Sequence, residues 1–132
     1  MMRVIVIGGA GVAEQVAGAL QSAGDEVTVI DTDPGREAAL TAAGLRSVRG
    51  DAAIPSTLEA AGALRADVIV ACTRSDEDNL VISLLAKKHF KVPQVVARVN
   101  DPANEGLFNE SWGVDALVSP STALVSMIRP PG

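Results

Sequence analysis

VIVIGGAGVAEQVAGAL, residues 4–20, is the stretch that decides the fold. It begins with four β-branched residues, passes through a glycine-rich loop, and continues with apolar residues at helical spacing. A short β-branched run bounded by glycines is typical of a strand that is buried on both faces. The stretch therefore predicts a strand, a tight turn and a helix, which together begin a parallel β-α-β unit.

The same alternation continues along the rest of the chain. Short runs rich in Val and Ile recur, and segments of helical period separate them. The predicted strands are 3–7, 26–30, 45–49, 67–71, 94–99 and 115–119, and the predicted helices are 12–23, 35–43, 55–61, 77–90 and 102–112. Strands that alternate with helices form parallel crossovers. We therefore expect an α/β fold, a Rossmann-like doubly wound domain whose six-stranded, mainly parallel sheet is flanked by helices.

Composition narrows the class of protein. The 132 residues suit one domain with its own core. Sixteen acidic against eleven basic residues give a net charge of -5, and without a basic cluster we expect no nucleic-acid partner.

The apolar runs are far shorter than the roughly 18 residues that a membrane-spanning helix requires. Cys72 is the single cysteine, which excludes an internal disulfide and fits a reducing cytoplasm.

The opening loop departs from the dinucleotide-binding pattern G-x-G-x-x-G. Read from Gly8, the second and third glycine positions hold Ala10 and Ala13. The second glycine normally lets the backbone approach a pyrophosphate, so the methyl of Ala10 points where a ligand oxygen would sit. Gly9 and Gly11 on either side give the loop room to shift, and alanine is an accepted variant at the third position. The candidate phosphate-binding residues are Gly8, Gly9, Ala10, Gly11, Val12 and Ala13. The alternative is a vestigial loop that is kept for its turn.

Asp31, with Thr32 beside it, follows the second predicted strand. A carboxylate at this position of a β-α-β unit accepts hydrogen bonds from the ribose hydroxyls, and the helix that starts at Val12 offers its N-terminus to an anion. Because no arginine directly follows Asp31 to receive a 2'-phosphate, we expect NAD(H) or an adenine nucleotide rather than NADP.

From the second strand onward the chain resembles the TrkA-N domain, or RCK N-lobe, of potassium-uptake regulators. The resemblance rests on an ordered series of motifs: VIDTDP (29–34), GDA (50–52), DEDNL (76–80), ARVNDP (97–102) and GVDALVSP (113–120). It implies that residues 1–120 form a nucleotide-binding Rossmann domain. Residues 121–132 would begin a crossover or dimerisation helix, and the C-terminal lobe of the family would be absent.

The resemblance also implies a function. It predicts a cytosolic regulatory subunit or domain of a potassium transporter or channel, in which bound nucleotide gates ion flux. NAD(H) is the favoured ligand, with ATP and ADP as alternatives. The expected partners are a membrane potassium transporter or channel subunit and a second copy of the chain, in a homodimer or a larger ring. The expected location is the cytoplasm, at the inner face of the membrane through that partner.

Family roles can be placed on individual positions. Asp31 resembles the ribose-binding acid, and Asp51 with Ala52 resembles the pair that lines the adenine pocket. Thr73 resembles a residue beside the distal part of the nucleotide, and Arg98 matches a basic position near the phosphates. These residues follow or end predicted strands, which is where open parallel sheets bind ligands.

Two departures bear on the ligand. Gly11 stands where many members of the family have a phosphate-binding arginine, and Ser121 stands where ATP-responsive members place a cation-binding glutamate. Charge-assisted contacts are the strong ones at such a site, so both changes disfavour a triphosphate with a bound metal. A dinucleotide or a diphosphate is less affected.

Several features favour a binding module over an enzyme. The chain contains no tyrosine and a single histidine, His89, which stands among lysines near a helix end. Hydride transfer needs an acid or base beside the substrate, and we assign no catalytic and no metal-binding residue. Asp76, Glu77 and Asp78 are interpreted as first-turn acids of a helix that Ser75 caps. The alternatives are a small nicotinamide-dependent oxidoreductase and a vestigial Rossmann interaction module.

Overall fold

The computed structural model describes residues 1–8 and 11–129. Its six strands are all parallel and lie in the order β3-β2-β1-β4-β5-β6, so the predicted fold class is confirmed. The strands are β1 (Arg3–Ile7), β2 (Glu26–Asp31), β3 (Arg46–Arg49), β4 (Val68–Ala71), β5 (Gln94–Arg98) and β6 (Ala116–Val118). The chain reverses its direction across the sheet between β1 and β4. In open parallel sheets this switch point is where ligands bind.

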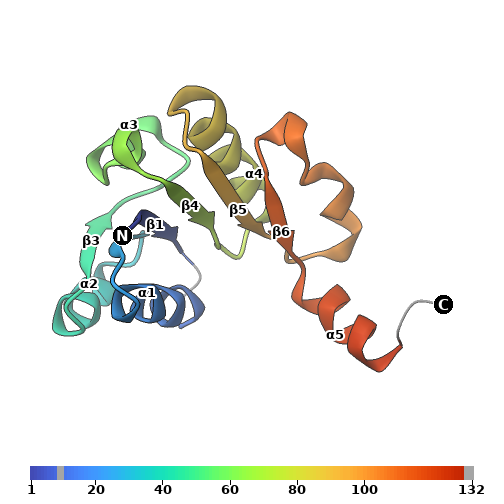
Figure 1. Ribbon diagram of the computed structural model, residues 1–132, viewed down its shortest axis with the longest axis horizontal. Coiled ribbons are helices and arrows are strands. Elements are labelled where there is room, and N and C mark those ends of the chain that lie inside the picture. The colour runs from blue at the N-terminus through green and yellow to red at the C-terminus, as the bar shows by residue number, and fades with distance from the viewer. Residues whose placement is uncertain (9–10, 130–132) are drawn as a thin grey trace.

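Helices cover both faces of the sheet (Figure 1). The helices α1 (Val12–Ser22) and α2 (Pro34–Ala42) lie on one face, and α3 (Pro55–Ala60) and α4 (Asp76–Leu84) lie on the other. The helix α4 begins as predicted, because the Ser75 hydroxyl accepts from the backbone amide of Asp78 at 3.1 Å. It continues into a π-helical turn, η2 (Leu85–His89), and the short 3-10 turn η1 (Ala63–Arg65) precedes β4.

The predicted helix over 102–112 is wrong in form. This segment consists of two 3-10 turns, η3 (Pro102–Leu107) and η4 (Glu110–Trp112). Phe108 is buried in the core and interrupts the turns, and the Asn109 side chain then accepts from the amide of Ser111 at 2.9 Å and starts the second. An asparagine that bonds to the nearby backbone competes with continued helix, and Gly106 weakens the helix before it.

The core lies in two layers, one on each side of the sheet. Alternate residues of a strand point to opposite faces. In β1, Val4 and Val6 join the layer beneath α1, whereas Ile5 and Ile7 join the layer beneath α3 and α4. The small residue Ala13 is buried in the first of these layers, which lets α1 lie close to the sheet.

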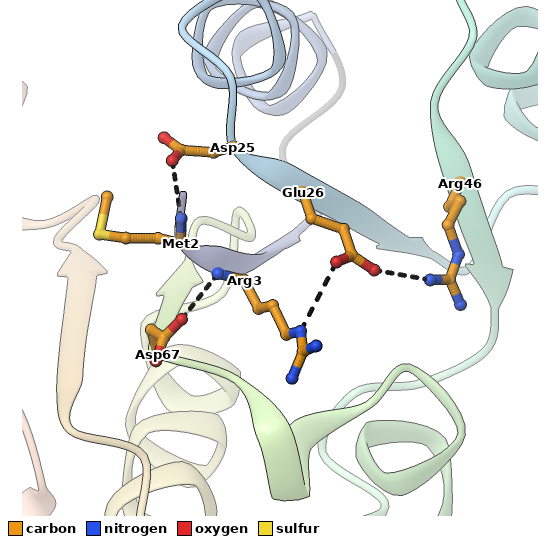
Figure 2. A network of polar contacts seen from close by, with 6 residues as sticks. All are labelled: Met2, Arg3, Asp25, Glu26, Arg46 and Asp67. Carbon is orange, nitrogen blue, oxygen red and sulfur yellow. Dashed lines mark hydrogen bonds and ion pairs between the residues drawn. The ribbon is translucent and has the colours of Figure 1, made fainter.

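Polar contacts hold the amino-terminal ends of the strands together (Figure 2). The amide of Met2 donates to Asp25 at 2.9 Å and the amide of Arg3 donates to Asp67 at 2.8 Å. Glu26 forms ion pairs with Arg3 at 3.5 Å and with Arg46 at 3.2 Å. Exposed ion pairs of this kind contribute about 0–1 kcal/mol each, so they add little to the stability of the fold.

The last helix, α5 (Pro120–Ile128), extends away from the body of the domain (Figure 1). It has no buried residue, and Leu124, Met127 and Ile128 are 62%, 82% and 78% exposed. Residues 130–132 of the predicted terminal segment lie outside the described residues. Within residues 1–8 and 11–129, none of the helices combines the length and the apolar character that crossing a bilayer demands.

Candidate functional site

A cavity of about 440 Å³ opens at the carboxyl ends of β1, β2, β3 and β4. Four segments that are far apart in sequence meet there because parallel strands end at the same edge of a sheet. The lining residues are Ile7, Gly8, Ile30, Asp31, Thr32, Asp33, Arg36, Gly50, Asp51, Ala52, Thr73, Arg74, Asp78 and Ile82.

The cavity brings together many of the residues that the sequence singled out. The predicted residues that line it are Gly8, Asp31, Thr32, Asp51, Ala52 and Thr73. Gly9 and Ala10 lie outside the described residues. Gly11 is the exposed N-cap of α1. Ala13 is a residue of α1 and is buried between this helix and the sheet.

Arg98 and Val12 lie elsewhere. Both line a second, apolar groove of about 640 Å³ on the α1 face of the sheet. The groove is formed by side chains of α1, β4, β5 and β6, among them Leu20, Val70 and Val118. Arg98 is therefore not among the residues that line the first cavity.

Local hydrogen bonds fix Asp31 at the cavity edge. Its Oδ1 accepts from the backbone amide of Asp33 at 3.0 Å, and Asp33 in turn accepts from the amide of Gly35 at 2.8 Å to cap α2. The backbone carbonyl of Asp31 accepts from the amide of Gly50. The carboxylate is 17% exposed, so it is held in place while remaining open to the cavity.

Gly8 turns the chain sharply where β1 ends. Its φ is +68°, in the left-handed region that favours glycine. A β-carbon at this position would lie 2.8 Å from Thr73 Cγ2 and 3.2 Å from Thr73 Cα. Gly8 therefore meets the requirement of the first glycine of a phosphate-binding loop, and its neighbour in space is a residue from the end of β4.

Thr73 is fixed by Asn79, a residue for which the sequence motifs predicted no separate role. The Asn79 Oδ1 accepts from the backbone amide of Thr73 at 3.0 Å and from its hydroxyl at 2.7 Å. The Asn79 Nδ2 donates to the carbonyls of Thr73 at 3.1 Å and Arg98 at 2.9 Å. Asn79 is fully buried, and these contacts satisfy its amide. The available signal was an asparagine on the same helical face as Ile82 and Ser83.

Asp76 ties α4 to the loop after β5. Its carboxylate accepts from the amide and the side chain of Asn100 at 2.7 and 3.0 Å, from the amide of Asp101 at 2.9 Å, and from Asn104 at 2.8 Å. Partial burial acts to raise the pKa of Asp76, but the hydrogen bonds from Asn100, Asn104 and Asp101 outweigh it and hold that pKa below its ordinary value. Asp76 is thus more than a first-turn acid, because it joins the start of α4 to the segment that follows β5.

The charges in the cavity are mostly negative. The aspartates are Asp31, Asp33, Asp51 and Asp78, and the arginines are Arg36 and Arg74. Carboxylates accept hydrogen bonds from sugar hydroxyls, whereas an excess of them repels further phosphates. Within the described ranges, no cluster of three or more His, Cys, Asp or Glu residues is arranged to hold a metal ion.

Arg36 reaches Asp31 through space, although it does not directly follow it in the sequence. Its Nη2 donates to Glu14 Oε2 at 2.7 Å, and its Nε lies 3.9 Å from Asp31 Oδ2. The sequence showed only that no arginine stands immediately after Asp31. The tertiary structure adds a cation from the first turn of α2 to the ribose end of the predicted site.

Comparisons with known proteins agree with the fold. The TrkA-N domain model matches residues 4–120. Over 131 residues the chain is 44% identical to the Trk system potassium uptake protein TrkA of Mycobacterium tuberculosis, covering 97% of this chain and 58% of that protein. The chain thus spans a little over half the length of this curated relative.

Solved structures share the architecture. The Kef CTD of Shewanella denitrificans in AMP-bound form superposes with a TM-score of 0.80 at 26% identity, over 96% of this chain and 76% of that chain. The GsuK channel bound to NAD gives a TM-score of 0.81 at 20% identity, over 96% of this chain and 23% of that chain. At 20% identity, the similarity to the GsuK channel is evidence for the fold alone.

Proposed function

The chain belongs to the TrkA-N domain family, and we propose that it is the nucleotide-binding part of a regulatory subunit of a potassium transporter or channel. The observation that carries this proposal is the cavity at the switch point of the sheet, with Asp31 and Asp51 at its edge. A similar domain at 26% identity, the Kef CTD, was solved with AMP bound.

The lining of the cavity supports a ligand that contains adenosine. Its volume of about 440 Å³ falls in the range of roughly 300–1,000 Å³ that is usual for small-molecule sites. Ile30, Ala52 and Ile82 supply apolar wall suited to a purine ring, and Asp31 supplies an acceptor for the ribose. NAD(H) is the favoured ligand and ADP or ATP are the alternatives. Gly8, Asp31, Thr32, Asp51, Ala52 and Thr73 are the proposed contacts.

The proposed mechanism is a shift between two arrangements of the regulatory assembly. A ligand can bias such an equilibrium only by its difference in affinity for the two arrangements. Thr73 and Gly8 bring the ends of β4 and β1 into contact within the cavity, so a nucleotide there would contact both halves of the domain. The membrane subunit of the potassium system is the proposed partner, and it would hold this chain at the cytoplasmic face of the membrane.

We also propose a homodimer. The helix α5 exposes Leu124, Met127 and Ile128, and the same chain carries an apolar groove beside α1. A two-fold contact would use both surfaces twice, burying the helix of each copy against the groove of the other. Larger rings would be built from such dimers.

We place the chain among ligand-sensing modules rather than nicotinamide-dependent oxidoreductases. The charged residues that line the cavity are aspartates and arginines. The single histidine, His89, lies in the turn η2 that follows α4 and is not one of the residues that line the cavity.

Calorimetric titration of the purified chain with NADH, NAD, ATP and ADP tests this function. We expect saturable binding of at least one of them, with one site per chain. Arg46→Met should leave that binding unchanged. It removes an exposed arginine at the amino-terminal ends of the strands, whereas the cavity lies at their carboxyl ends (Figure 2). No detectable binding of any of the four nucleotides by a folded chain would contradict the proposal.

A further inference from the structure

Arg36 stands at the edge of the cavity with a buried hydrogen-bond donor that the described part of the chain leaves unpaired. Its side chain is 25% exposed, and its Nη2 is held by Glu14 Oε2 at 2.7 Å. Its Nε is buried and has no hydrogen-bond partner within residues 1–8 and 11–129. The Asp31 Oδ2 atom, 3.9 Å away, is beyond ordinary hydrogen-bond distance.

A buried donor without a partner is costly, so the gap between Arg36 and Asp31 indicates where a ligand group would bind. The Asp31 Oδ1 atom already accepts from the amide of Asp33, which leaves Oδ2 as the oxygen that faces Arg36. The gap therefore has an N–H donor on one side and a carboxylate acceptor on the other.

A hydroxyl group has the chemistry that this gap requires. It carries one O–H donor and two acceptor lone pairs. Placed about 2.8 Å from each atom, an ordinary hydrogen-bond length, a hydroxyl oxygen can accept from Arg36 Nε while it donates to Asp31 Oδ2. An ionised phosphate has no proton to donate to Asp31, and Glu14 adds a second negative charge beside it. A C–H group at this place would leave Arg36 Nε unsatisfied.

We propose that Arg36 is a specificity-determining residue that, together with Asp31, recognises one ribose hydroxyl of the bound nucleotide. Glu14 is a positioning residue, because its ion pair with Nη2 holds the guanidinium beside Asp31. The inference rests on the proposed nucleotide-binding function and goes further. It predicts a preference for ribonucleotides over nucleotides that lack the recognised hydroxyl or carry a phosphate there.

The test compares ADP, 2'-deoxy-ADP and 3'-deoxy-ADP by calorimetry on the full chain. ADP is chosen because NAD, ADP and ATP share it. For the wild-type protein we expect one of the two deoxy analogues to bind about tenfold more weakly than ADP, the scale of one charge-assisted hydrogen bond. In Arg36→Met this discrimination should fall to about twofold or less.

Two further variants make the comparison specific. Arg36→Lys keeps the positive charge for Glu14 but lacks the second, fixed donor of a guanidinium, so it should lose discrimination as Arg36→Met does. Arg46→Met also removes an arginine paired with a glutamate, but at the opposite edge of the sheet, and should keep the wild-type preference. Thermal unfolding checks that each variant is folded, and if Arg36→Met does not fold, Arg36→Lys carries the test.

The outcomes separate this inference from the function on which it rests. Equal binding of ADP and both deoxy analogues by the wild-type chain would overturn the role of Arg36 and leave nucleotide binding intact. Discrimination that persists in the Arg36 variants would do the same. Binding of NADH without binding of ADP would overturn it too, because the recognised ribose belongs to the ADP part. No binding of any nucleotide would instead refute the proposed function.

Discussion

Gly8 and Thr73 are in direct contact across the switch point of the sheet. A β-carbon on residue 8 would lie 2.8 Å from Thr73 Cγ2, a distance that real β-carbons do not tolerate. This contact joins the end of β1 to the end of β4 in the floor of the cavity. The buried Asn79 fixes Thr73 through two hydrogen bonds. The turn at Gly8 therefore packs against a side chain that is held in place.

We therefore expect Gly8→Ala to destabilise the domain by about 1–3 kcal/mol, because it combines a left-handed φ with a steric clash. Gly18→Ala is the matched control. Gly18 lies inside α1, where a β-carbon would meet open space, so alanine should be neutral or stabilising by up to about 1 kcal/mol. Urea unfolding measures both, and equal stability of Gly8→Ala and the wild type would show that the loop relaxes.

Asp31→Ala should weaken nucleotide binding by about 1–3 kcal/mol, the scale of lost hydrogen bonds to a charged group. Asp25→Ala serves as its control, because Asp25 accepts from the backbone amide of Met2 at the amino-terminal ends of the strands, away from the cavity (Figure 2). Calorimetric titration of the two variants with the nucleotide that binds the wild type decides the matter. Unchanged affinity in Asp31→Ala would remove this residue from the site.

Asp76→Asn should make stability less dependent on acidic pH. The folded-state pKa of Asp76 is below its unfolded value near 3.8. The carboxylate therefore stabilises the fold above that unfolded value, and this contribution is lost as the pH falls through the folded-state pKa. At pH 7 we expect the variant to be less stable by about 1–3 kcal/mol, and we expect the difference from wild type to shrink below about pH 4.

Urea unfolding at pH 7, 4 and 3 checks the Asp76 prediction. Glu77→Gln provides the comparison, since Glu77 is exposed in the same first turn of α4 and should change stability little. A difference between Asp76→Asn and the wild type that stays constant with pH would mean that shape, and not charge, is what Asp76 contributes.

The helix α5 should hold a dimer. Leu124, Met127 and Ile128 share one stripe at helical spacing, and Ser126 lies on the opposite side. Light scattering should find a dimer for the intact chain and a monomer for a version cut after Ser121. Ile128→Glu should also dissociate the dimer, because it buries a charge in the contact, whereas Ser126→Glu should not. A monomeric wild-type chain would rule the contact out.

The sequence by itself determined the fold and much of the cavity, because the signals involved are local. Strand and helix are read from the periodicity of apolar residues, and the end of β2 at Asp31 follows from where that pattern stops. Once parallel strands are predicted, their carboxyl ends must share one edge, which places Gly8, Asp51 and Thr73 near Asp31 without any further information.

Only the tertiary structure decided which polar groups meet. Arg36 contacts Glu14, 22 residues earlier, and Asp76 binds Asn100, 24 residues later. Neither pairing leaves a periodic pattern, since each depends on how the packing of whole elements brings distant segments together. The place of Arg98 also depends on the packing of β5. Ala97 and Val99 join the core beneath α4, so the alternation of β5 turns Arg98 to the opposite face, where it lines the groove beside α1 together with Val12.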